Sequence, residues 1–256
     1  MFTRCIVRAP AETFALGLTT AQLGVPDHSL AVRQHEAYCY ALKRCGLDVT
    51  MLPPDPEYPD STFVEDTAIL TERCAILTHP GASSREGEVA SIRPTLASFY
   101  HRIHAITAPG TLDGGDICDA DGHFFIGISA RTNEEGARQL GELLVNEGYT
   151  ASYVDVRNVP GILHLKSGIA SLGDGHLLLI EALADHPAFE GYHRHLVPPE
   201  ETYAANCIRV NETVLLAEGF PQVGNLVENL GLPVISLNMS EFEKMDGGLS
   251  CLSLRF

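Results

Sequence analysis

Residues 63–78 read FVEDTAILTERCAILT, in which two apolar runs flank a short charged turn near Glu72 and Arg73. The β-branched content and the turn chemistry of such a stretch predict a β-hairpin. The same plan recurs in residues 115–129 (GDICDADGHFFIGIS), 165–180 (LKSGIASLGDGHLLLI) and 205–217 (ANCIRVNETVLLA). A fifth hairpin is expected from pairing of residues 251–255 with residues 4–8. The chain is therefore expected to be built from repeats.

Helical patterns and single strands follow the hairpins. Residues 29–45 carry an apolar face and stop at Gly46, and residues 132–148 open with the capping-box spacing of Thr132 and Glu135. Weaker helices are expected at 86–99 and 222–230, and single strands at 49–52, 103–107, 152–156, 196–197 and 234–237. The unit of hairpin, helix and strand recurs about every 40–50 residues, roughly five times. Units that bury apolar faces only against neighbours can close into a ring; an ordinary α+β domain is the alternative.

The charge balance bears on the class of ligand. The chain has 17 Lys and Arg against 33 Asp and Glu, a formal net charge of −16. Such a surface repels phosphate backbones and anionic lipids, which argues against nucleic-acid and membrane-surface roles and favours a cationic small substrate. The first ten residues, MFTRCIVRAP, lack the features of a signal peptide, and no apolar run is long enough to span a bilayer. A cytoplasmic protein is expected.

The cysteines indicate a reduced protein. Their number, seven, is odd, and none are spaced as CxxC. A disulfide framework or a dedicated zinc site is therefore not expected, although zinc capture by a reactive Cys and His stays open. Most of the cysteines are predicted to be small core residues. Cys251 differs because it follows the polar and glycine-rich run Asp246-Gly247-Gly248-Leu249-Ser250.

Polar residues recur near the start of each hairpin. They are Glu65-Asp66, Asp113 with Asp116, His164, Asn206 and Cys251. If the strand starts converge on a ring axis, Cys251 would be a nucleophile, His164 a proton carrier and a carboxylate such as Asp113 its orienting partner. Taken singly, His164 could be a core histidine and Asp113 a turn residue. Glu65 and Asp66 stand in an apolar run, where two carboxylates need a cationic partner to offset desolvation.

A set of motifs resembles one known family. The stretches are Tyr58-Pro59-Asp60-Ser61, Phe63-Val64-Glu65-Asp66, Thr111-Leu112-Asp113-Gly114-Gly115-Asp116, Ser129-Ala130-Arg131-Thr132-Asn133, Leu163-His164-Leu165-Lys166, Ala204-Ala205-Asn206-Cys207 and Asp246-Gly247-Gly248-Leu249-Ser250-Cys251. Together they resemble the dimethylarginine dimethylaminohydrolase family of the pentein superfamily. The resemblance implies an α/β fold, a five-bladed propeller of pseudo-symmetric ββαβ units, with residues 1–256 forming a single catalytic domain.

The resemblance also implies an activity and roles for individual residues. The activity is hydrolysis of asymmetric dimethylarginine and monomethylarginine to citrulline and dimethylamine or methylamine, through a covalent thiouronium adduct and without a cofactor. By motif, Cys251 is the nucleophile, His164 the general acid and base, and Asp113 the third catalytic group. The implied substrate-binding residues are Glu65 and Asp66 for the guanidinium, Asp60 and the Leu18 backbone for the α-amino group, Arg85 and Arg131 for the α-carboxylate, Phe63 beside the methylated end, and Ser250. Residues 17–24, bounded by glycines, resemble the family's mobile lid.

Three alternatives stay open at this point. An arginine deiminase or another guanidino hydrolase would share the chemistry and differ in pocket size. A non-catalytic pentein that binds a macromolecule would lack the Cys, His and carboxylate set. A metal-dependent hydrolase would be sensitive to chelators. The expected partner is a small molecule, because bidentate arginines suit a free α-carboxylate, and the protein is expected to be a monomer or homodimer.

Overall fold

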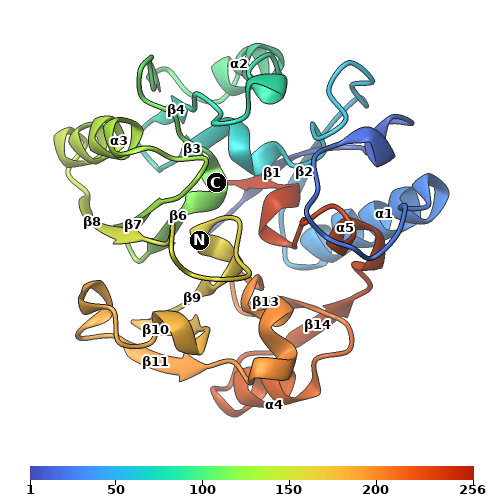
Figure 1. The fold of residues 1–256 in the computed structure, drawn as a ribbon, viewed down its shortest axis with the longest axis vertical. Coiled ribbons are helices and arrows are strands. Elements are labelled where there is room, and N and C mark those ends of the chain that lie inside the picture. Colours follow the sequence, from blue (N-terminus) through green and yellow to red (C-terminus); the bar gives the residue numbers. More distant parts are fainter. The chain divides into compact units, whose positions relative to one another are not determined.

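Five three-stranded sheets share one plan in the computed structural model, which describes residues 1–256 (Figure 1). In each sheet two strands form an antiparallel pair, and a third strand pairs in parallel with the central one. The chain divides into two compact units, one formed by residues 1–64 and 206–256 and the other by residues 65–205. The repeat read from the sequence is therefore present in every sheet.

The first unit holds two of the sheets. Their orders are β15 (Leu254–Arg255), β1 (Arg4–Arg8), β2 (Asp48–Leu52) and β12 (Ile208–Val210), β13 (Thr213–Ala217), β14 (Val234–Leu237). The helices of this unit are α1 (His28–Arg44), α4 (Pro221–Asn229) and α5 (Ser240–Glu243). The antiparallel pairing of β15 with β1 confirms the fifth hairpin, although its C-terminal strand begins at Leu254 and not at Cys251.

The second unit holds the other three sheets. Their orders are β3 (Ala68–Leu70), β4 (Ala75–Leu77), β5 (Ile103–Ala105); β6 (Ile117–Ala120), β7 (His123–Ile128), β8 (Thr150–Asp155); and β9 (Ile169–Gly173), β10 (His176–Leu179), β11 (His193–Leu196). Its α-helices are α2 (Glu88–Ala97) and α3 (Glu134–Asn146). The connection from β10 to β11 contains two 3-10 turns, Glu181–Leu183 and Pro187–Phe189, where the other sheets have an α-helix.

The hairpin turns form where the sequence places residues that tolerate a positive φ. Asp121 and Gly122 have φ of 57° and 86°, and Asp174 and Gly175 have 52° and 74°. Two consecutive positive φ angles match the right-handed twist of the flanking strands, and Asp-Gly is among the cheapest pairs for this turn. The predicted turns at 120–122 and 173–175 are confirmed.

Apolar side chains from helix and sheet form the core of the second unit. Leu140 and Leu144 of α3 are fully buried, and they belong to one cluster with Ile76, Leu112 and Ile126. Helical spacing of four residues places both leucines on one face of α3, so this face covers the strands. None of the helices combines the length and the apolar content needed to cross a lipid bilayer.

One local prediction was wrong. Helix α3 is capped by Asn133, whose side chain accepts a hydrogen bond from the Gly136 amide at 2.8 Å; Thr132 instead donates to a buried carboxylate. Here a tertiary contact outweighed the local pattern.

Candidate active site

A short 3-10 turn precedes the first strand of every sheet, where the sequence pattern predicts the strand itself. The turns are Val64–Thr67, Gly114–Asp116, Leu165–Ser167, Pro199–Ala205 and Ser250–Leu252. The recurring polar residues lie in these turns or directly beside them: Asp66, Asp113, His164, Asn206 and Cys251. Each functional side chain is therefore held at the entry of a buried strand.

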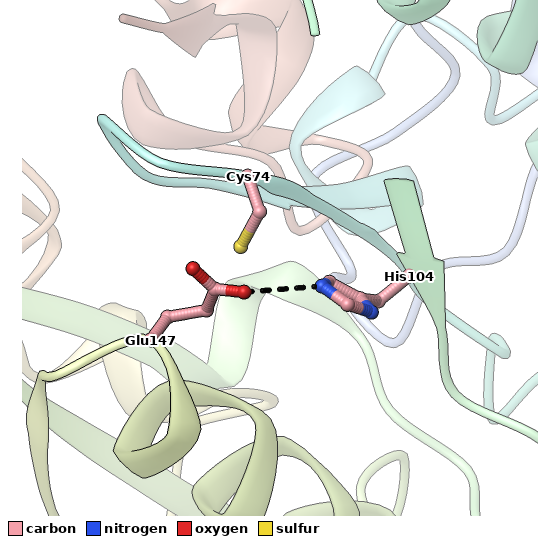
Figure 2. A group of neighbouring side chains, drawn as sticks. All are labelled: Cys74, His104 and Glu147. Atoms are coloured by element: carbon pink, nitrogen blue, oxygen red, sulfur yellow. Dashed lines mark ion pairs between the residues drawn. The ribbon is translucent and has the colours of Figure 1, made fainter. Parts of the chain in front are cut away.

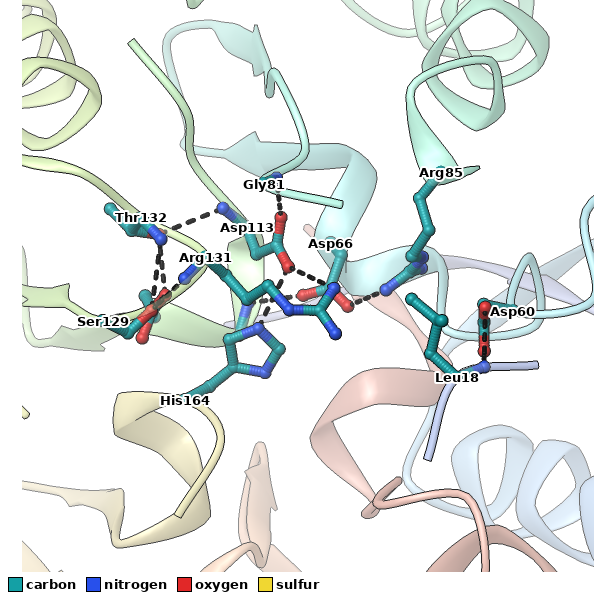
Figure 3. Close-up of polar contacts among 12 residues, drawn as sticks. Leu18, Asp60, Asp66, Gly81, Arg85, Asp113, Ser129, Arg131, Thr132 and His164 are labelled. Atoms are coloured by element: carbon teal, nitrogen blue, oxygen red, sulfur yellow. Dashed lines mark hydrogen bonds and ion pairs between the residues drawn. The ribbon is translucent and has the colours of Figure 1, made fainter. Parts of the chain in front are cut away.

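His164 and Asp113 form the central pair of the second unit (Figure 3). The His164 Nε2 lies 3.1 Å from Asp113 Oδ2, and Asp113 is fully buried. The other oxygen, Oδ1, accepts a hydrogen bond from the Gly81 amide at 2.9 Å. The Arg131 guanidinium lies 3.9 Å from Oδ2. Both oxygens of Asp113 are thus held by hydrogen bonds, and its predicted role of orienting the imidazole stays a prediction.

The environment of His164 favours its protonated form. Burial alone would lower the pKa of the imidazole, but the negative charges of Asp66, Asp116 and Asp113 outweigh this and raise the pKa to about 9. An imidazolium at neutral pH can donate a proton to a leaving group. This geometry suits the general-acid role that the sequence predicts for His164.

Asp66 contributes the second carboxylate close to His164. Its Oδ1 accepts from the Gly115 amide at 2.8 Å, and its Oδ2 accepts from Arg85 Nη1 at 2.6 Å. Burial would raise the pKa of Asp66, but Arg85 and His164 lower it to about 2. A Cβ at Gly115 would lie 2.7 Å from His164 Nδ1, so only glycine allows this approach.

Arg85 is engaged by carboxylates on two sides. Besides Asp66, the guanidinium donates from Nε and Nη2 to the two oxygens of Glu88, at 3.0 and 2.8 Å. Arg85 and Glu88 are buried, and this bidentate pair fixes the plane of the guanidinium. Arg85 therefore acts as the counter-ion of Asp66, and its predicted contact with a substrate carboxylate stays a prediction.

Glu65 and Asp66 have separate cationic partners. Lys166 Nζ lies 2.5 Å from Glu65 Oε1, whereas Asp66 is paired with Arg85. The requirement that two carboxylates in an apolar run be neutralised is thus met by one cation each. Asp66 and Asp113 lie close to His164, and Glu65 pairs with Lys166 in the turn that follows His164.

Asp116 organises the region, a role that the sequence analysis did not assign. This fully buried carboxylate accepts hydrogen bonds from Ser129 Oγ and Thr132 Oγ1 at 2.7 Å, and from the Leu165 amide at 2.9 Å. Burial raises its pKa. The Leu165 contact positions the turn that follows His164. Its signal in the sequence was a second aspartate three residues after Asp113.

The Cys251 turn lies in the first unit and is held by Asn206. Asn206 Oδ1 accepts from the Ser250 amide at 2.9 Å, and its Nδ2 donates to Ser250 Oγ at 3.2 Å. The Gly248 amide donates to Cys251 Sγ at 3.4 Å, and Ser250 Oγ lies 4.0 Å from that sulfur. A Cβ at Gly248 would approach the Asn206 side chain to 2.5 Å. Asn206 therefore positions this turn, a role that the sequence pattern did not predict for it.

The glycine-bounded segment 17–24 is hydrogen-bonded to Lys244 and Asp246, which precede the Cys251 turn. The Thr20 amide and hydroxyl both donate to Asp246 Oδ2, at 2.5 and 3.0 Å, and the Thr19 hydroxyl donates to the Lys244 carbonyl at 2.8 Å. The Leu18 amide donates to both oxygens of Asp60, at 3.0 and 3.2 Å. The predicted lid and the predicted amino-group ligands are thus directly linked.

Phe63 lies within a buried aromatic cluster of the first unit. Its ring centroid is 6.0 Å from that of Phe14 and 6.3 Å from that of Phe242. A Cβ at Gly247 would lie 2.3 Å from the Phe63 ring. The backbone of Gly247, in the segment that leads to Cys251, therefore packs directly against this ring. The placement is compatible with the predicted contact to an apolar substituent.

The donor set of the His164 region also bears on metal binding. Side-chain donors of Asp66, Asp113 and His164 lie within 4.8 Å of one another. The cationic charge that these carboxylates require is already provided by Arg85 at 2.6 Å and by Arg131 at 3.9 Å. The arrangement therefore fits proton transfer better than a metal centre.

Comparison with known proteins gives consistent relatives. The chain is 47% identical over 257 residues to the dimethylarginine dimethylaminohydrolase of Pseudomonas aeruginosa, with all of both chains covered. It is 34% identical to the enzyme of that name from Streptomyces coelicolor, covering 98% of this chain and 96% of that protein. No protein-family model matches the chain.

Solved structures agree with these relatives. A Pseudomonas dimethylarginine dimethylaminohydrolase, in a cysteine-to-serine variant with citrulline bound, superposes with a TM-score of 0.97 at 46% identity and full coverage of both chains. The N-terminal domain of a cyanobacterial arginine dihydrolase, ArgZ, has a TM-score of 0.87 at 16% identity, covering 98% of this chain and 97% of that domain. The second likeness concerns the fold alone.

These comparisons and the five equivalent sheets define the class of protein, an α/β propeller of the pentein superfamily. The fold class predicted from the sequence is thereby confirmed. Within that class the chain belongs to the dimethylarginine dimethylaminohydrolase family, as the motifs predict.

Proposed function

We propose that this protein hydrolyses free Nω-methylated arginines to citrulline and a methylamine, with residues 1–256 acting as one catalytic domain. The observation that carries the proposal is the buried His164–Asp113 pair with Asp66 beside it, in a chain of this family. Two negative carboxylates around a protonated imidazole provide both a binding charge for a guanidinium and a proton for its leaving group. The enzyme is thus a hydrolase of C–N bonds in linear amidines.

Binding comes first in the proposed reaction. Asp66 and Glu65 hold the guanidinium, and Phe63 packs beside its methyl groups. Asp60 and the Leu18 backbone bind the α-amino group. Arg131 and Arg85 bind the α-carboxylate, for which Arg85 exchanges one of its carboxylate partners. Ser250 supports the turn that carries the nucleophile. Fixing the guanidinium plane lets a nucleophile approach the carbon from above it.

The chemistry then proceeds in two halves. The Cys251 S–H bond breaks, its proton goes to solvent, and the thiolate attacks the guanidinium carbon, forming a C–S bond and a tetrahedral intermediate. His164 donates its proton to the methylated nitrogen, the C–N bond breaks, and dimethylamine or methylamine departs, which leaves a thiouronium adduct. His164, now neutral, removes one proton from water, and the water oxygen bonds to the carbon. The C–S bond then breaks, the remaining hydroxyl proton goes to the Cys251 sulfur, and citrulline is released. Asp113 keeps the imidazole oriented throughout.

Relatives support the assignment of cysteine and histidine. One structure is the cysteine-to-serine variant of the Pseudomonas enzyme with citrulline. A second dimethylarginine dimethylaminohydrolase structure is a histidine-to-glycine variant carrying an adduct with S-methyl-L-thiocitrulline. The second matches this chain with a TM-score of 0.97 at 46% identity. These proteins therefore bind a citrulline-like amino acid in the same fold.

The test is a citrulline assay with arginine, monomethylarginine and asymmetric dimethylarginine side by side. We expect the methylated substrates to have the higher kcat/KM, and equal or faster turnover of arginine would contradict the proposal. Cys251→Ser should abolish citrulline formation while the circular dichroism spectrum is retained. Cys207→Ser, which alters a buried cysteine of the same unit, is the matched control. The oligomeric state, expected to be a monomer or homodimer, is measured on the same samples by light scattering.

A further inference from the structure

A second cluster of metal-binding side chains lies in the second unit, apart from the His164 region. Cys74, His104 and Glu147 bring three donor atoms of different kinds within 4.8 Å of one another (Figure 2). His104 Nε2 lies 3.4 Å from Glu147 Oε1. The proposed reaction uses none of these residues.

Three separate elements bring the cluster together. Cys74 directly precedes β4, His104 lies in β5, and Glu147 caps the C-terminal end of α3. The parallel register places Ile76 of β4 opposite His104. Since side chains alternate along a strand, Cys74 and Ile76 share a face. Figure 2 shows the thiol, the imidazole and the carboxylate pointing toward one another.

Two of the three side chains are buried, and one donor atom lacks a hydrogen bond. Cys74 is fully buried and Glu147 is 9% exposed, whereas the His104 side chain is 35% exposed. The Nε2 atom of His104 is nevertheless buried and has no hydrogen-bond partner. A buried polar atom without a partner is costly and calls for an explanation. A cation that accepts the His104 lone pair would provide one.

The spacing and chemistry of the donors fit zinc. Zinc binds sulfur at about 2.3 Å and nitrogen or oxygen at about 2.0–2.2 Å in a tetrahedron, so its ligand atoms stand about 3.3–3.6 Å apart. The 3.4 Å between His104 Nε2 and Glu147 Oε1 lies within this range. A thiolate with an imidazole favours zinc over the harder magnesium and calcium ions.

We propose that Cys74, His104 and Glu147 form a zinc site that joins the β3–β4–β5 sheet to the end of α3. On binding, the Cys74 S–H bond breaks, its proton goes to solvent, and a Zn–S bond forms. A thiolate, a carboxylate and a neutral imidazole balance the two positive charges, and water completes the tetrahedron. Zinc then stabilises the second unit, because it binds the folded protein and has no preformed site in the unfolded chain.

Arg102 competes with the metal for Glu147. Its Nη1 lies 3.0 and 3.2 Å from the two carboxylate oxygens, and its side chain is 67% exposed. An ion pair this exposed contributes little to stability, but its positive charge opposes a cation on the same carboxylate. Arg102→Gln should therefore tighten zinc binding several-fold. If the Arg102–Glu147 ion pair did not oppose zinc, Arg102→Gln would leave the zinc affinity unchanged.

The experiment uses the full chain with Cys251→Ser, so that the half-buried candidate nucleophile cannot capture metal. Zinc and cobalt(II) are titrated, with bound metal counted by elemental analysis and thiolate–cobalt charge-transfer absorption recorded. We expect one zinc per chain and release of one proton. Adding Cys74→Ser or His104→Gln should weaken binding at least about 100-fold. Cys118→Ser, at a buried cysteine of β6 in the same unit, is the matched control and should change nothing.

A second measurement guards against misfolded variants. In the Cys251→Ser protein with no other change, maleimide labelling in mild urea is followed at each cysteine by mass spectrometry. Zinc should protect Cys74 more strongly than Cys118, which gains only from the stabilisation of the second unit as a whole. Any one of three results overturns the proposal. The Cys251→Ser protein binds no zinc, Cys74→Ser leaves its zinc affinity unchanged, or Cys74 is labelled equally with and without zinc.

Discussion

The protonation of His164 yields the sharpest quantitative prediction. Its pKa is raised from 6.5 to about 9 in the folded protein, mainly because Asp66, Asp116 and Asp113 outweigh the effect of burial. A raised pKa stabilises the folded state fully below the unfolded value of about 6.5, and this stability is lost as the pH rises through 9. His164 thus contributes between about 2 and 3 kcal/mol at pH 7 and well under about 1 kcal/mol at pH 9.5.

The pKa itself can be measured by NMR. The chain contains 11 histidines, and a sample labelled at histidine is titrated from about pH 5 to pH 10. Comparison with the spectrum of His164→Gln assigns the resonance. We expect a midpoint near 9 for His164, well above the reference value of about 6.5 for a histidine side chain.

Urea unfolding then tests the linkage. The free energy of unfolding of the wild type, minus that of His164→Gln, should fall by about 2 kcal/mol between pH 7 and pH 9.5. Taking the difference cancels the titration of other groups. A flat difference together with an NMR midpoint below about 7 would refute the electrostatic reasoning for this site.

The charge responsible can be identified by substitution. Asp113→Asn should lower the pKa of His164, because it replaces the carboxylate 3.1 Å from Nε2 with a neutral amide. Glu72→Gln, which neutralises an exposed carboxylate of the same unit, should leave it unchanged. Equal shifts in the two variants would mean that net charge and not the local pair sets the pKa.

Three further substitutions test substrate binding, the attachment of residues 17–24 and the stability of the fold. Arg131→Ala should raise KM for methylarginine about 10-fold or more with a smaller effect on kcat, and steady-state kinetics showing an unchanged KM would remove it from the carboxylate site. Asp246→Ala removes both hydrogen bonds to Thr20, so residues 17–24 should become more sensitive to limited proteolysis, and KM should rise. Unchanged cleavage would show that these hydrogen bonds do not hold the segment in place. Asp116→Ala leaves three donors without their buried acceptor and should lower the free energy of unfolding by about 3–5 kcal/mol in urea titrations. A loss below about 1 kcal/mol would show that water replaces the carboxylate.

The local features of the fold could be read from the amino-acid sequence. Asp121-Gly122 and Asp174-Gly175 marked hairpin turns because these residues tolerate positive φ at low cost. Apolar spacing located α1 and α3 to within a few residues. The adjacency of two carboxylates in an apolar run also required cations, and the structure supplies them. Turn chemistry, periodicity and desolvation act over a few residues, so the sequence displays them directly.

Which side chains contact one another was decided only by the tertiary structure. The sequence required a cation for Asp66 but did not identify Arg85 as that cation. It placed Asp116 among the recurring polar residues but did not indicate that Asp116 would anchor the turn after His164. Cys74, His104 and Glu147 showed no metal-ligand spacing, because 30 and 43 residues separate them along the chain. Such contacts depend on strand register and on how a helix packs against its sheet. Those are set by the burial of many apolar side chains at once, and a local sequence pattern does not contain them.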